Sequence, residues 1–101
     1  MSEEKLAEWR TQIDDIDREM VTLLARRFQI TREVGEWKAQ NGVPPVDPER
    51  EKRQVARLQE RAAETGLSAD FLERFLRIII DEVVSHHRAI RDEDFEAPDP
   101  L

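Results

Sequence analysis

The sequence has no cysteine, only three glycines, and no apolar run long enough to cross a membrane. Without cysteine, a disulfide framework, a zinc ribbon and a CxxC redox site are all excluded. The glycines, at positions 35, 42 and 66, do not form a phosphate-binding loop. The N-terminal residues MSEEKLAEWR lack the apolar core of a signal peptide. We therefore expect a cytoplasmic protein that does not interact with a membrane.

Acidic residues outnumber basic ones by 23 to 16, which gives a net charge of −7 over 101 residues. Nucleic-acid binding needs a basic face, so we expect no nucleic-acid partner. One stretch is nevertheless locally basic, with Arg50, Lys52, Arg53, Arg57 and Arg61. These basic residues keep the binding of a small anionic ligand possible.

Turn-forming residues gather at residues 41–45, 65–68 and 97–100, and helical periodicity fills the segments between them. The pattern predicts an all-α fold with three helices per chain, the first much the longest. The chain length allows a single small domain, which we expect over residues 1–93. Residues 94–101, acidic and proline-containing, are expected to form a flexible tail.

The first helix, expected from about Glu3 to Ala39, carries an uninterrupted heptad seam. Its apolar members are Leu6, Trp9, Ile13, Ile16, Met20, Leu23, Ile30, Val34 and Trp37, and Arg27 is its one polar member. At about 1.5 Å per residue such a helix is roughly 55 Å long. A compact domain of about 100 residues has a radius of gyration near 13 Å. The chain cannot wrap this helix by itself, which predicts an intertwined homodimer.

The two later helices have clear starting signals. Asp47 followed by Pro48 predicts an N-cap and first turn, and Gly66 predicts the end of the second helix. Ser68 is the expected start of the third helix. The predicted buried stripe of that helix consists of Leu72, Phe75, Leu76, Ile79, Val83, one of His86 and His87, and Ile90.

Two cations lie on one side of the first helix. Arg27 and Lys38 are eleven residues apart, three turns along and about 20° round the axis. A buried guanidinium must meet an anion or reach solvent, so Arg27 either pairs with Glu51 or Glu33, sets the helix register, or binds an anionic ligand. Lys38 alone would be read as a solvated residue favoured by the helix dipole. Its position on the same side of the helix as Arg27 makes an anion site possible.

Glu51 extends the apolar face of the second helix, with Arg50 beside it. Taken alone, Glu51 is better explained as a first-turn glutamate stabilised by the helix dipole, with Arg50 as a neighbouring surface residue. Arg10 precedes Arg27 by 17 residues, about 25 Å along the axis, so the two cannot share a small ligand within one chain. In an antiparallel pair of first helices they can approach each other. Taken alone, Arg10 is better explained as a solvated arginine paired with Asp14.

No metal-ligand spacing is present, because the adjacent His86 and His87 point about 100° apart. No serine has an evident base, and no cysteine can act as a nucleophile. The inward polar residues therefore suit the binding and polarisation of a small dianion. We expect no metal and no cofactor.

The segments carrying these residues resemble one family. They are Arg10, IDDID at residues 13–17, LLARR at 23–27, VGEWK at 34–38 and VDPERE at 46–51. Together they resemble the all-helical (AroQ-class) chorismate mutases over roughly residues 6 to 91. The resemblance implies a homodimer with two composite sites that converts chorismate to prephenate by a Claisen rearrangement.

By the same resemblance, Arg27 and the partner's Arg10 would hold the substrate carboxylates, and Lys38 would donate to the ether oxygen. Glu51 and the backbone near Asp47 would hold the ring hydroxyl, with Arg50 supporting the pocket. Catalysis would need a reactive conformer and a cation at the developing oxyanion.

The third helix departs from the family pattern. A small hydroxyl residue is usual where Val83 lies, and glutamine or glutamate where His87 lies. Val83 cannot hydrogen-bond a carboxylate, whereas His87 can donate to the ether oxygen in a pH-dependent way. Isochorismate pyruvate-lyases and 4-amino-4-deoxychorismate mutases share the fold and stay open as alternatives, as does a non-catalytic dimerisation module.

Overall fold

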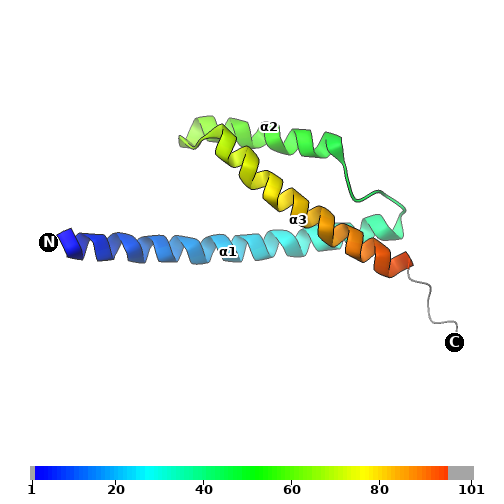
Figure 1. The fold of residues 1–101 in the computed structure, drawn as a ribbon, viewed down its shortest axis with the longest axis horizontal. Coiled ribbons are helices and arrows are strands. Elements are labelled where there is room, and N and C mark those ends of the chain that lie inside the picture. Colours follow the sequence, from blue (N-terminus) through cyan, green and yellow to red (C-terminus); the bar gives the residue numbers. More distant parts are fainter. Residues whose placement is uncertain (1, 96–101) are drawn as a thin grey trace. The chain divides into compact units, whose positions relative to one another are not determined.

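The computed structural model describes residues 2–95, and the side chains of residues 2–93. It contains three α-helices, α1 (Ser2–Gln40), α2 (Pro48–Thr65) and α3 (Ala69–Phe95), and no strand among the described residues (Figure 1). The predicted all-α fold with a long first helix is confirmed. Of the expected tail, residues 94 and 95 close α3, and residues 96–101 lie outside the described part of the chain.

The chain divides into two units, Met1–Thr31 and Arg32–Leu101. The first unit is the greater part of α1, a continuous helix (Figure 1). In it, the seam side chains are exposed: Leu6, Trp9, Ile13, Ile16, Met20, Leu23 and Ile30. A water-exposed apolar seam of this length is unfavourable for a lone helix.

The second unit contains α2, α3 and the end of α1. Helices α2 and α3 pack on each other. The start of α2 follows from its caps. Asp47 accepts a hydrogen bond from the backbone N–H of Arg50, and Pro48 occupies the first turn, where a missing N–H costs nothing. Gly66 ends α2 in the left-handed conformation, at φ 77°. Ser68 caps α3 by accepting from the Phe71 N–H at 3.2 Å.

Few side chains are buried in the second unit. Among the described residues the buried apolar side chains are Ala62, Leu76, Ile79 and Ile80, and the buried polar one is His87. Of the predicted α3 stripe, Leu76, Ile79 and His87 are buried. Ile80, which was not predicted to be part of the stripe, is buried as well. Phe75, also predicted in the stripe, is 39% exposed and stacks on Phe71.

Candidate active site

Lys38 lies in the last turn of α1, where the chain turns toward α2. The turn is closed by a hydrogen bond from the Val43 N–H to the Lys38 carbonyl at 2.8 Å, and Gly42 adopts a left-handed φ of 66°. The Lys38 ammonium donates back to the Pro45 carbonyl at 3.4 Å. Half-buried and anchored, Lys38 differs from a solvated helix-end lysine. An ammonium has three donors, so this contact uses one of them.

Asp47, two residues past Pro45, is the N-cap of α2. Its Oδ1 accepts from the Arg50 N–H at 3.1 Å, and its carbonyl accepts from the Glu51 N–H at 3.0 Å. These two hydrogen bonds place Asp47, Arg50 and Glu51 in one turn. The turn lies close in sequence to Pro45, whose carbonyl accepts from Lys38. The Arg50 side chain is exposed.

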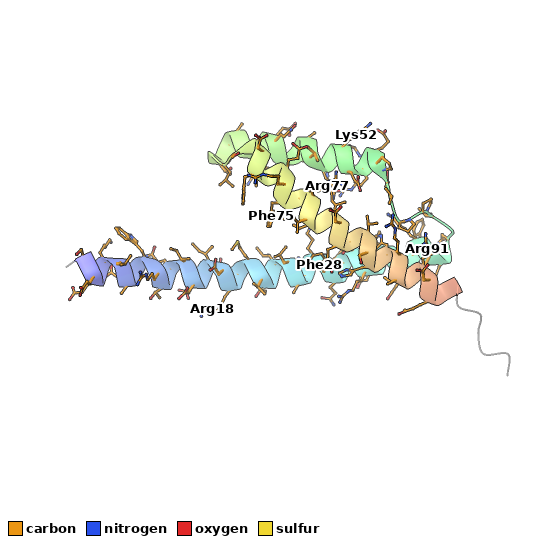
Figure 2. All side chains as sticks on the ribbon, in the orientation of Figure 1. Arg18, Phe28, Lys52, Phe75, Arg77 and Arg91 are labelled. Atoms are coloured by element: carbon orange, nitrogen blue, oxygen red, sulfur yellow. The ribbon has the colours of Figure 1, made fainter. Side chains whose placement is uncertain are left out.

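Glu51 projects toward α3 and is half-buried, with its side chain 19% exposed. Its Oε2 lies 3.6 Å from Nη1 of Arg77, on the part of α3 that lies beside α2 (Figure 2). Sequence reasoning missed Arg77, because the two residues are on different helices and no local spacing links them. Both line a groove of about 440 Å³ whose other residues are Val46, Asp81, Val84, Ser85 and Arg88.

Val83 and His87 occupy a different face of α3 from the groove. Val83 is one residue before Val84 and so points about 100° away from it. His87 is buried, at 4% exposure, and its ring packs against the backbone of Gly35 near the end of α1. Between the two histidines that the sequence left open, His87 is the inward one, while His86 interacts with Glu82 at 3.0 Å.

Arg10 and Arg27 lie in the N-terminal unit, on the same continuous helix. Arg10 is exposed and Arg27 is half-buried. Their spacing of 17 residues on α1 corresponds to about 25 Å along the axis. Within one chain these two guanidinium groups cannot hold one small ligand.

The second unit thus brings Lys38, Asp47, Arg50 and Glu51 to one end of α2. This arrangement presents an anchored ammonium and a carboxylate that can accept a hydrogen bond. Within residues 2–93, no group of three or more His, Asp or Glu side chains is arranged to hold a metal ion. None of the described helices combines the length and the apolar character that a membrane span requires.

Comparisons with known proteins agree with this architecture. The sequence model of the family described as chorismate mutase type II matches residues 9–88. A chorismate mutase of Methanocaldococcus jannaschii is 34% identical over 93 residues, which cover 92% of this chain and 90% of that protein.

Longer relatives match only in part of their length. The T-protein of Haemophilus influenzae is 42% identical over 82 residues, 78% of this chain and 21% of that protein. The bifunctional chorismate mutase/prephenate dehydratase of Escherichia coli (strain K12) is 28% identical over 99 residues, 98% of this chain and 26% of that enzyme. The chain therefore spans about a fifth to a quarter of these relatives. Because the family match extends over residues 9–88, this chain belongs to the chorismate mutase type II family.

Proposed function

We propose that this protein is a cytoplasmic chorismate mutase that converts chorismate to prephenate. The observation that carries the proposal is the family match over residues 9–88, which includes every candidate site residue. The anchored Lys38 ammonium supports it, because the reaction needs a cation at a defined position rather than a nucleophile.

The proposed mechanism is a concerted rearrangement, in which the ether C–O bond breaks while a C–C bond forms. Lys38 donates to the ether oxygen, which gains negative charge in the transition state. His87 is a second donor to that oxygen. No proton has to be transferred, so the site acts through electrostatics and through the conformer that it holds.

The other site residues bind the substrate. Arg27 and Arg10 of the partner subunit hold the two carboxylates, for which a forked guanidinium is well suited. Glu51 and the backbone near Asp47 hold the ring hydroxyl, and Arg50 supports this end of the pocket. Val83 adds an apolar wall where a hydroxyl residue is usual.

The proposal includes a homodimer. The heptad seam is exposed in the single chain, for example at Trp9 (51%) and Leu23 (61%), and a second copy supplies an identical seam. A second copy also brings its Arg10 toward Arg27, which the roughly 25 Å spacing on one helix forbids within a chain. An antiparallel pairing of α1 helices satisfies both requirements.

The activity is tested by incubating the purified chain separately with chorismate, isochorismate and 4-amino-4-deoxychorismate and separating the products against prephenate and pyruvate standards. Prephenate is the expected product. Pyruvate formed from isochorismate would instead identify a lyase, and a 4-amino-4-deoxychorismate preference a sister mutase. If none of these substrates is converted, the chain is a non-catalytic helical module and the proposal is wrong.

The dimer is tested by sedimentation equilibrium of the wild type and of Ile16→Glu, which puts a charge into the seam. The wild type should sediment as a dimer, and Ile16→Glu should shift the equilibrium toward monomer. Val21→Glu is the matched control, since Val21 is 66% exposed on the same helix and lies outside the seam. A monomeric wild type would contradict the dimer.

A further inference from the structure

One guanidinium nitrogen of α3 lies between two carboxylates. Nη1 of Arg77 is 3.6 Å from Oε2 of Glu51 on α2 and 3.9 Å from Oδ1 of Asp81, one turn further along α3. The Arg77 side chain is 51% exposed and Asp81 is 69% exposed, while Glu51 is only 19% exposed. The cation therefore reaches from the exposed side of the groove to a carboxylate that is largely withdrawn from water.

This arrangement restricts the orientation of Glu51. A glutamate side chain has several rotatable bonds and loses conformational freedom when it is held in one rotamer. The α2 backbone places the Glu51 stem, and the Arg77 contact selects where its carboxylate points. Asp81 in turn restrains Arg77, since residues four apart on a helix are neighbours. The orientation of Glu51 is thus set by α3 as well as by α2.

A carboxylate has two oxygens with several acceptor positions, so an ion pair leaves capacity for a further donor. The 3.6 Å separation is an ion-pair contact, longer than a direct hydrogen bond. Arg77 can therefore fix the direction of the carboxylate without occupying all of its acceptor positions.

We propose that Arg77 is a positioning residue that holds the Glu51 carboxylate in the orientation that accepts the hydrogen bond from the substrate's ring hydroxyl. The inference rests on the proposed function and adds to it a residue of α3 outside the family motif quoted above. Arg77 touches no substrate atom in this scheme. Its effect on substrate binding depends on Glu51 and should disappear when Glu51 is replaced. A general effect of the Arg77 charge on the groove would not depend on Glu51.

The test is a double-mutant cycle on chorismate turnover with Arg77→Gln, Glu51→Gln and the double variant. A hydroxyl contact made equally in ground and transition states affects KM more than kcat. Arg77→Gln should raise KM about threefold to tenfold and change kcat less than about twofold, the range expected for a half-buried ion pair. In the Glu51→Gln background, Arg77→Gln should change KM by less than about twofold, because coupled residues are not additive.

Arg74→Gln is the matched control, because it removes an exposed arginine of the same helix outside the groove. It should leave KM unchanged. If Arg77→Gln does not fold, Arg77→Met, which keeps the packing of the aliphatic stem, takes its place in the cycle. Thermal unfolding of every variant accompanies the kinetics.

Two results would overturn the positioning role in an active enzyme. One is a KM effect of Arg77→Gln that is equally large with and without Glu51. The other is a lower melting temperature with unchanged KM, which would make the ion pair merely structural. A wild-type chain that leaves chorismate unconverted would contradict the proposed function itself, and the positioning role would fall with it.

Discussion

The imidazole of His87 packs directly on the backbone of Gly35, near the end of α1. A Cβ atom at residue 35 would lie 2.5 Å from Cδ2 and 3.1 Å from Nε2 of His87, and 3.1 Å from Cδ1 of Ile90. Real Cβ atoms essentially never come within 3.0 Å of such a neighbouring atom, so the 2.5 Å approach to Cδ2 means that the absence of a side chain at Gly35 allows His87 to be buried. A small residue on one helix thus determines where a candidate catalytic side chain of another helix lies.

Gly35→Ala should therefore destabilise the protein. In a helix interior the change from glycine to alanine normally stabilises by about 0.5–1 kcal/mol. Here the clash with His87 opposes that gain, and overpacking typically costs about 1–3 kcal/mol. We expect a net loss of about 1–2 kcal/mol in the free energy of unfolding, measured by urea denaturation at fixed protein concentration.

The control for Gly35→Ala is the same change made in a His87→Ala background. With the imidazole removed, most of the clash disappears, and Gly35→Ala should become neutral or stabilising. An equal loss of stability in both backgrounds would show that the His87 contact is not the cause.

His87 should also make catalysis pH-dependent. A charged imidazolium stabilises a developing oxyanion better than a neutral imidazole, and histidines ordinarily titrate between pH 5 and 8. The protonated form dominates at low pH, so kcat at saturating chorismate should fall as pH rises through the titration of His87. His87→Gln should flatten this profile and retain substantial activity. Parallel profiles for the two proteins would assign His87 to packing alone.

Lys38→Ala should lower kcat much more than stability. Loss of one preorganised donor to a developing oxyanion typically costs about 10²–10³ in rate. The matched control is Lys52→Ala, which removes an exposed lysine whose pair with Glu49 is at the surface. Lys52→Ala should keep near-wild-type kcat in the same assay. A loss below about threefold for Lys38→Ala, far short of that expected for such a donor, would place the cation elsewhere.

Composite sites predict complementation between two inactive variants. Arg10→Ala and Lys38→Ala are each expected to be inactive as homodimers. When the two are unfolded together and refolded, mixed dimers should form one site with both residues intact, because Arg10 and Lys38 come from different chains. Activity should rise toward one wild-type site per mixed dimer, measured by prephenate formation. Mixed dimers that form and stay inactive would contradict the shared-site arrangement.

The sequence by itself determined the three helices, the start and end of α2 and the start of α3. Asp47, Gly66 and Ser68 were predicted as caps, and each is observed in that role. Capping is a local interaction, made within about three residues of the helix end. Local patterns are sufficient to predict it. The family resemblance drawn from the α1 and α2 motifs is likewise confirmed, because those motifs are contiguous in the chain.

Only the tertiary structure decided which side chains meet across helices. The helical spacing left His86 and His87 equal, since neighbours on a helix point about 100° apart and either direction can be inward, and only the family resemblance singled out His87. In the structure His87 is the buried one, because Gly35, far away in sequence, leaves space for its ring. Arg77 was missed for the same reason, as its partner Glu51 is on another helix. Side-chain contacts between distant segments depend on how the helices pack. A spacing pattern within one segment predicts which of its faces is buried, but not which residues of another helix that face contacts.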